Sequence, residues 1–193
     1  MADLNSIVFY GSLGILVLAA AAQFFPRALL TARARLIFWL SVVLVLGYAS
    51  FTAYLQYRAF ENGPLSFVLG TTEGLKWFVG YARLHFLNEY LVSLITAIVI
   101  ALFAEYFNRR KGELFFEREE LYIAALGIFL VGYPGFLFYI PLVLILSLLT
   151  SVFFVKRGER LPLYYFWMPT AIAVLLAVQF WAENQSWWTS FRF

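Results

Sequence analysis

No charged side chain interrupts the chain from Leu121 to Val155. A helix needs about 20 apolar residues to cross the hydrocarbon core of a membrane, so this run is too long for one membrane-spanning helix. Hydrophobic residues make up 63% of the 193 residues and charged residues 13%, whereas soluble domains average about 45–50% and about 25%. A chain of this size cannot hide so much apolar surface in a core of its own. The composition therefore excludes a soluble globular domain and predicts an all-α, polytopic membrane protein.

The apolar runs predict a bundle of about six transmembrane helices in a single domain, residues 1–193. Pro134 and Pro141 divide the long run, because proline removes a backbone donor and disfavours helix in the residue before it. Pro162 suits the first turn of the last helix, where its missing N–H costs nothing. The expected spans cover about 7–25, 36–57, 84–107, 119–139, 141–156 and 162–181.

Basic residues fall mainly on one side of this arrangement. Most of the 14 lysines and arginines lie in the three turns at 26–35, 108–118 and 156–161. Because cytoplasmic loops of membrane proteins are enriched in Lys and Arg, we expect these turns on the cytoplasmic side. Six spans then place both termini outside the cytoplasm, and we expect the protein in the cytoplasmic (inner) membrane of a prokaryote.

Scarce residue types disfavour several chemistries. The chain has no cysteine and a single histidine, His85. Disulfides, thiolate metal sites, multi-histidine zinc sites and Ser-His hydrolases are therefore not expected, and no cofactor is predicted. Nucleic acid is not an expected partner, since no basic stripe lies on a soluble face. Membrane lipid is an expected partner.

The longest connection, 58–83, mixes aromatic and charged residues in its second half. One interpretation is a short helix in the plane of the membrane interface, with Trp77 and Tyr81 at the level of the lipid headgroups. The other interpretation is a capped helix within the loop, packed on the bundle. The pattern favours neither over the other.

Ionisable residues inside membrane spans are costly, which makes them candidates for function. His85 and Glu89 are four residues apart and share a helical face, on which they could hydrogen-bond. They indicate either a polar or proton-handling site near the outer surface or an interfacial pair in contact with water. Glu105 lies four residues before Arg109, in the orientation that favours an ion pair.

Carboxylates gather at the expected inner end of the fourth span. They are Glu113, Glu117, Glu119 and Glu120. The dipole of a helix favours carboxylates at its N-terminus, which explains the last three without any activity. Clustered carboxylates can alternatively raise one another's pKa and act as acid and base, or bind a divalent cation. We assign no metal ligand among them.

The order of segments after residue 105 resembles a known family. The run EELYIAALGIFLVGYPG at 119–135 is followed by a second hydrophobic segment, a basic turn at 156–160 and LPLYYFWMP at 161–169. This order resembles the C-terminal half of the type IV prepilin peptidases, which are GxGD-type intramembrane aspartyl proteases. In that family an Ala-Ala-Leu-Gly-like helix follows the GxGD motif. A basic turn and a Leu-Pro-x-x-Pro-like segment then open the last helix. The resemblance covers about residues 105–180.

The resemblance implies a site at the cytoplasmic end of the fourth span. Phe116 and Arg118 stand where the family has its two glycines, and Glu119 stands where it has its aspartate. Gln23 is the nearest equivalent of the partner aspartate. An aspartyl dyad needs two carboxyl groups at close range, and Glu105 could supply the second one to Glu119 if the helices bring them together. Glu119 and Glu105 are therefore the candidate catalytic residues. The candidate substrate-binding residues are Glu117, Glu120, His85 and Glu89.

Without the GxGD motif, the resemblance implies a relative that is non-catalytic or altered in activity and that binds a leader-peptide-bearing protein. Such a protein should place Glu119 within hydrogen-bond reach of another carboxylate in a cavity open to the cytoplasm. One alternative is a non-enzymatic subunit of a membrane complex, held to other membrane subunits by aromatic and small residues. Another is a small-molecule or lipid binder, with a cavity lined by Tyr48, Tyr54, Trp39 and Glu89.

Overall fold

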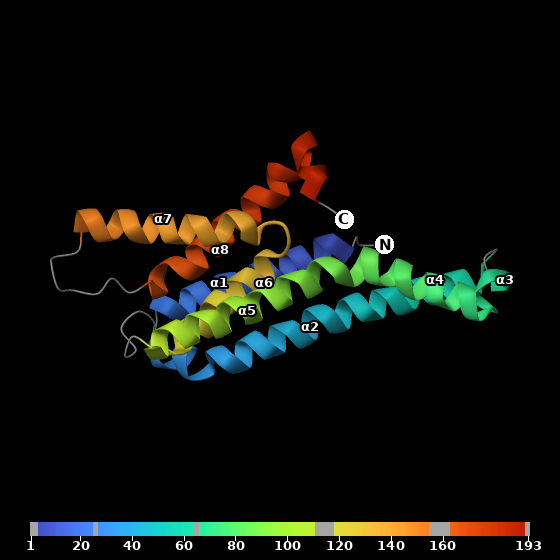
Figure 1. Cartoon of the computed structure of the whole chain (residues 1–193), viewed down its shortest axis with the longest axis horizontal. Coiled ribbons are helices and arrows are strands. Elements are labelled where there is room, and N and C mark those ends of the chain that lie inside the picture. The colour runs from blue at the N-terminus through green and yellow to red at the C-terminus, as the bar shows by residue number, and fades with distance from the viewer. Residues whose placement is uncertain (1–3, 25–26, 64–65, 111–117, 155–162, 192–193) are drawn as a thin grey trace.

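The computed structural model describes residues 4–24, 27–63, 66–110, 118–154 and 163–191, and every regular element within them is helical (Figure 1). The α-helices are α1 (Leu4–Phe24), α2 (Arg27–Glu61), α3 (Ser66–Leu69), α4 (Thr72–Ala82), α5 (Asn88–Arg110), α6 (Arg118–Val131), α7 (Phe136–Phe154) and α8 (Tyr164–Phe180). A π-helical segment, η1 (Arg83–Leu87), joins α4 to α5, and short 3-10 segments, η2 (Ala182–Asn184) and η3 (Ser186–Phe191), follow α8. The all-α prediction is confirmed for the described residues.

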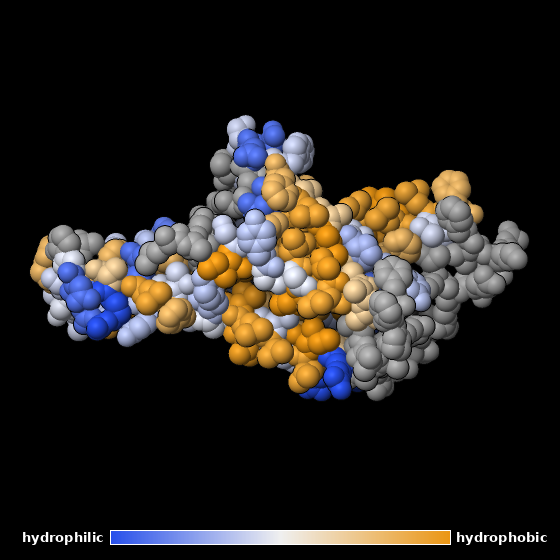
Figure 2. Space-filling model, turned by 180° about the vertical axis from the view of Figure 1, so that it is seen from behind, coloured by the Kyte–Doolittle hydropathy of each residue, from blue (hydrophilic) through white to orange (hydrophobic). Residues whose placement is uncertain are grey.

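Four described helical segments are long and apolar enough to cross a membrane, as a membrane protein requires. They are Ser6–Gln23, Arg33–Glu61, Thr72–Arg110 and Phe136–Phe153. Much of the outer surface is apolar too, and hydrophobic residues gather over the middle of the face seen in Figure 2. Leu148, Val152 and Phe153 of α7 each expose 65% or more of their surface. A soluble monomer rarely exposes apolar patches on this scale, so the surface is consistent with contact to lipid.

Helix α6 forms the centre of the bundle. From Glu120 to Val131 every residue except Tyr122 is buried, because α1, α2, α5, α7 and α8 all pack against this helix. A helix that is hydrophobic all round is buried in this way. Its 14 residues span about 21 Å, less than the hydrocarbon thickness of about 30 Å. Composition therefore makes α6 resemble a membrane span although it is too short to cross alone.

The chain reverses between α6 and α7 in a turn that contains Pro134, before the boundary expected at 139–141. The expected fourth span ends near 139, whereas α6 ends at Val131 and α7 begins at Phe136. Gly132 has a φ of 76°, a conformation that glycine adopts without steric cost, and this residue breaks the helix. Pro141 lies inside α7 rather than at its start. The turning point is therefore set by Gly132 and not by Pro141.

Helices α2 and α4–η1–α5 extend well beyond the expected spans 36–57 and 84–107. They run antiparallel and project together past the other helices, with α3 at the tip (Figure 1). The rings of Tyr57 and Phe60 on α2 contact Phe78 on α4, with centroid separations of 5.2 and 5.9 Å. We call residues 53–82 the hairpin, because its small core of Ala53, Leu69, Phe78 and Ala82 is separate from the core of the bundle.

The structure favours the capped-helix interpretation of the 58–83 connection. The Thr71 hydroxyl accepts a hydrogen bond from the backbone N–H of Gly74 at 3.0 Å, which satisfies an otherwise unpaired donor of the first turn. Helix α4 then continues through η1 into α5 and packs on α2 through its aromatic side chains. It is therefore part of a long helix and not a separate element lying across the end of the bundle.

Candidate binding groove

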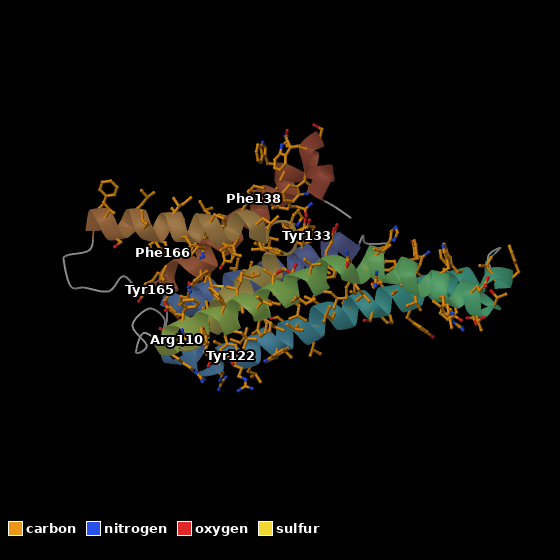
Figure 3. The ribbon with its side chains drawn as sticks, viewed as in Figure 1. Arg110, Tyr122, Tyr133, Phe138, Tyr165 and Phe166 are labelled. Atoms are coloured by element: carbon orange, nitrogen blue, oxygen red, sulfur yellow. The ribbon has the colours of Figure 1, made fainter. Side chains whose placement is uncertain are left out.

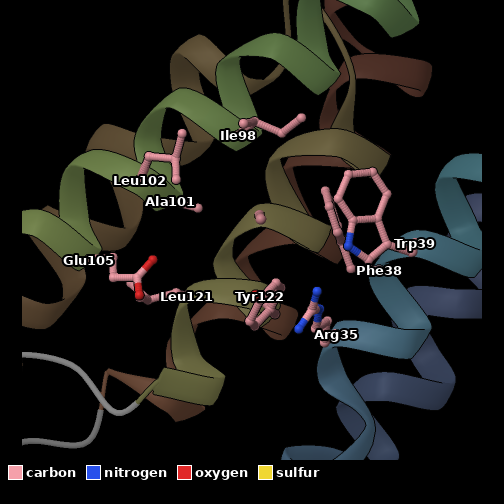
Figure 4. A pocket seen from close by; sticks show the side chains of 10 residues that line it. Arg35, Phe38, Trp39, Ile98, Ala101, Leu102, Glu105, Leu121 and Tyr122 are labelled. Carbon is pink, nitrogen blue, oxygen red and sulfur yellow. The ribbon is translucent and has the colours of Figure 1, made fainter.

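A groove of about 410 Å³ lies between α2 and α5, with α6 as its floor (Figure 4). Helices α2 and α5 both pack against α6 but make little contact with each other, which leaves the space between them open. The apolar lining residues are Phe38, Ile98, Ala101, Leu102, Leu121 and Ala125, and the residues with polar groups are Arg35, Trp39, Glu105 and Tyr122. The groove is therefore apolar over most of its wall and has a few hydrogen-bonding groups.

The polar groups lie toward the end of the groove where α6 begins. Arg35 comes from α2 and Glu105 from α5, and Leu121 and Tyr122 lie between them in Figure 4. Figure 3 shows Tyr122 at the same end of the bundle as Arg110, while Tyr133 lies toward the other end of α6. The groove thus has a polar end beside the start of α6 and an apolar remainder.

The charges at the polar end are unequally compensated. The Glu105 carboxylate accepts a hydrogen bond from Arg109 four residues later, so the predicted ion pair is confirmed. The guanidinium of Arg110 lies over the ring of Tyr106, with Cζ 4.7 Å from the centroid. Arg35 has neither kind of partner among the described residues. Within the described part of the chain, its positive charge is therefore the uncompensated one in the lining of the groove.

Two further donors of the lining are also without hydrogen-bond partners among the residues that the structure describes. They are the indole N–H of Trp39 and the hydroxyl of Tyr122. In Figure 4 the indole nitrogen of Trp39 lies on the side of its ring that faces Arg35, and Tyr122 lies beside the guanidinium. Three donors, two from α2 and one from α6, thus line the same groove.

The predicted carboxylate site is described only in part. Glu105 lines the groove next to Leu121 and Tyr122, so the end of α5 does lie beside the start of α6. Glu120 is buried, with 4% of its surface exposed, and it has a partner. Glu117 and the side chain of Glu119 lie outside the described part of the chain. The proposed pairing of Glu119 with Glu105 therefore stays a prediction.

His85 and Glu89 lie in different surroundings. The ring of His85 is exposed, stacks on Tyr81 with centroids 4.2 Å apart, and places Nδ1 3.1 Å from the Tyr81 carbonyl oxygen. Glu89 instead lines a small cavity of about 90 Å³ between α1, α5, α8 and the end of α6, together with Ser12 and Gln179. The structure places the half-buried Glu89 beside a cavity of the bundle and leaves His85 on the hairpin side of α5.

The residues expected to line one ligand cavity are distributed over several places. Trp39 lines the groove and Glu89 lines the small cavity, while Tyr48 and Tyr54 line neither. Sequence reasoning missed Arg35, which it used only as a marker of orientation, and Tyr122. The spacing of Arg35, Phe38 and Trp39 would have placed them on one face of a helix.

Gln23, the position compared above with the partner aspartate, has a structural contact. Its side chain is 3% exposed, and its Nε2 donates a hydrogen bond to the backbone carbonyl of Tyr164 at 2.7 Å. This contact joins the end of α1 to the start of α8. Gln23 does not line the groove.

Comparisons with protein-family models, with curated proteins and with solved structures find no match to this chain. Among the described residues, no group of three or more His, Cys, Asp or Glu side chains could hold a metal ion. The kind of ligand that the groove could bind is therefore inferred from its described lining residues. They form an apolar wall, a carboxylate paired with Arg109, and a guanidinium without an ion-pair partner beside two neutral donors.

Proposed function

We propose that this chain is a membrane protein that binds an amphipathic ligand, a lipid, in the groove between α2 and α5. The proposal rests on the arrangement of the lining residues, which are apolar along most of the groove and polar at one end. A volume of about 410 Å³ lies in the range of about 300–1,000 Å³ that is usual for ligand sites. The apolar outer surface of the bundle would let such a ligand enter sideways from the membrane.

The proposal includes six membrane-embedded segments with both termini outside the cytoplasm, in a prokaryotic cytoplasmic membrane. Arg33 and Arg35 near the start of α2 and Arg109 and Arg110 at the end of α5 support this orientation, because Lys and Arg are enriched at cytoplasmic ends. The short α6 is packed against α1, α2, α5, α7 and α8, and a helix satisfies the backbone hydrogen bonds of its interior internally. Its length therefore does not argue against an embedded position.

In this orientation the groove lies in the inner leaflet. Its wall on α5 runs from Glu105 to Ile98, which is about 10 Å of helix, or a third of the hydrocarbon core. A lipid in the groove would place its headgroup beside Arg35 and the first part of an acyl chain along Ala101 and Ile98. The rest of the chain would remain among bulk lipid.

Filling the groove tests the proposal. Ala101→Trp puts an indole into the space between α2 and α5, whereas Val99→Trp puts the same side chain on the exposed surface of α5. We expect native mass spectrometry of the detergent-purified protein to show a retained lipid with the wild type and with Val99→Trp. Ala101→Trp should lose it. Equal lipid retention by Ala101→Trp and the wild type would rule out the groove as the binding site.

A second candidate function, kinship with the type IV prepilin peptidases with catalysis lost or altered, is favoured by the position of Glu105. This carboxylate lies against the start of α6, where the resemblance puts its site. The test is photo-crosslinking of a prepilin leader peptide to the purified protein, with mass spectrometry to detect cleavage. Crosslinking that is weakened by Glu105→Gln would support kinship. The absence of both crosslinking and cleavage would remove this candidate.

A further inference from the structure

The charge of Arg35 defines what kind of headgroup the groove can hold. Arg35 and Glu105 are its two charged lining residues. Glu105 is already paired with Arg109, so a cationic group on a ligand would have to compete with an arginine for that carboxylate. Arg35 has no ion-pair partner among the described residues. Among the described lining residues, the groove therefore offers its occupant one positive charge without an ion-pair partner and no negative charge without one.

A guanidinium beside an apolar wall is suited to phosphate. Its planar fork can donate two parallel hydrogen bonds to a phosphate, and charge-assisted bonds of this kind are stronger than neutral ones. Trp39 Nε1 and the Tyr122 hydroxyl are further donors in the same lining (Figure 4). Basic pockets between membrane helices near the cytoplasmic surface hold anionic headgroups in the same way.

We propose that the groove selects anionic phospholipids over zwitterionic ones, with Arg35 as the residue that recognises the phosphate. The inference rests on the proposed function and names its ligand class. A zwitterionic headgroup carries the same phosphate but brings a quaternary ammonium or ammonium group with it. That cation would meet Arg35 at the polar end, where Glu105 is the one carboxylate among the lining residues that the structure describes, and Arg109 already engages it. Repulsion at this end therefore disfavours the zwitterionic lipid.

The test is lipid competition followed by native mass spectrometry. The purified wild-type protein receives equimolar phosphatidylglycerol and phosphatidylcholine of the same acyl chains, and the ratio of the two bound lipids is measured. We expect roughly tenfold preference for phosphatidylglycerol, which corresponds to about 1.4 kcal/mol of repulsion between Arg35 and the cationic group of phosphatidylcholine. Arg35→Gln should bind the two lipids equally, and Arg35→Lys should retain part of the preference because it retains the charge.

Arg33→Gln is the matched control, because Arg33 is an exposed arginine one half-turn away on α2 that does not line the groove. It should leave the preference unchanged. An unchanged lipid preference in Arg35→Gln would overturn the inference. An equal loss of the preference in Arg33→Gln would overturn it too, because it would show a general effect of net charge.

Failure of this inference is distinguishable from failure of the proposed function. Ala101→Trp should reduce the binding of both lipids, since it fills the apolar part of the groove. If Ala101→Trp reduces both and Arg35→Gln keeps the preference, the groove binds lipid but Arg35 does not select it. If Ala101→Trp leaves both lipids bound as in the wild type, the groove is not the lipid site and both proposals are wrong.

Discussion

Gly127 on α6 lies so close to the ring of Tyr139 on α7 that a Cβ atom at Gly127 would overlap the Tyr139 hydroxyl. That hydroxyl donates a hydrogen bond to the backbone carbonyl of Trp167 on α8 at 3.1 Å, and the Tyr139 side chain is fully buried. The absence of a side chain at Gly127 therefore allows one tyrosine to join three helices at a single point.

Gly127→Ala should destabilise the protein by about 1–3 kcal/mol, because overpacking at a buried contact forces Tyr139 out of its position. The matched control is Gly14→Ala, where the new methyl group would meet nothing within 4 Å. In the control alanine should be neutral or stabilising by up to about 1 kcal/mol, since it lowers the entropy cost of the helix. Thermal unfolding in detergent, followed by circular dichroism, measures both. Equal melting temperatures for the two variants would contradict the contact.

Tyr139→Phe should cost about 1 kcal/mol, the usual net value of a hydrogen bond, through loss of the bond to Trp167. It should also reduce the penalty of Gly127→Ala, because the hydroxyl oxygen is the atom that the new Cβ meets first. The double variant should then be more stable than the sum of the single effects by at least about 0.5 kcal/mol. Strict additivity in the same unfolding assay would show that the two residues do not interact.

Composition and run length predict the helices because an embedded helix must be apolar over a long stretch. They do not locate the end of α6, since a left-handed glycine such as Gly132 has no signature that separates it from a helical glycine. A Cβ at Gly127 would overlap a neighbouring helix, whereas a Cβ at Gly11, Gly14 or Gly47 would have nothing within 4 Å. Whether a glycine is required at a position depends on how closely another helix packs there, which the sequence around the glycine does not show.

The groove is harder to predict than the helices. The spacing of Ile98, Ala101, Leu102 and Glu105 places them on one face of a helix from the sequence alone. That Arg35 of α2 lies across from this face depends on how both helices pack on α6. No local pattern carries this information, which is why Arg35 and Tyr122 escape a residue-by-residue search for charged pairs.

Gln23 should matter for stability and not for lipid binding. Its Nε2 donates to the Tyr164 carbonyl at 2.7 Å in a buried position. Gln23→Glu removes this donor and buries a carboxylate, which costs more than burying a neutral group. Gln23→Leu removes the donor together with Oε1, a buried acceptor without a hydrogen-bond partner among the described residues, so its net cost should be about 1 kcal/mol. We expect melting temperatures in the order wild type, Gln23→Leu, Gln23→Glu, with lipid retention unchanged in Gln23→Leu. A higher melting temperature for Gln23→Glu than for Gln23→Leu would contradict this assignment.

The tip of the hairpin should depend on Gly74. A Cβ at this position would overlap the backbone carbonyl of Val68, so Gly74→Ala must push α3 away from α4. Gly80→Ala, on the same helix with nothing within 4 Å, is the matched control. Hydrogen exchange should become faster in residues 66–74 of Gly74→Ala and remain unchanged in the bundle, because the hairpin has a core of its own. Unaltered exchange at the tip would show that α3 and α4 do not pack as described.

The orientation of the long helix can be tested directly because the chain contains no cysteine. From Glu73 on α4 to Arg110 on α5 the helix is continuous, and its length of about 55 Å exceeds the full bilayer thickness of about 40–45 Å. Single cysteines at these two positions should therefore lie on opposite sides of the membrane. A membrane-impermeant maleimide should label Glu73→Cys in intact cells and Arg110→Cys only after permeabilisation.

Ile95→Cys supplies the control for this experiment. Ile95 is 61% exposed on the surface of α5, midway between charged ends, so the proposed orientation places it in contact with hydrocarbon. Its cysteine should resist the aqueous reagent before and after permeabilisation, since a thiol in lipid does not ionise to the reactive thiolate. Rapid labelling of Ile95→Cys would show that water covers this face, and labelling of both end positions in intact cells would show that α5 does not cross the membrane.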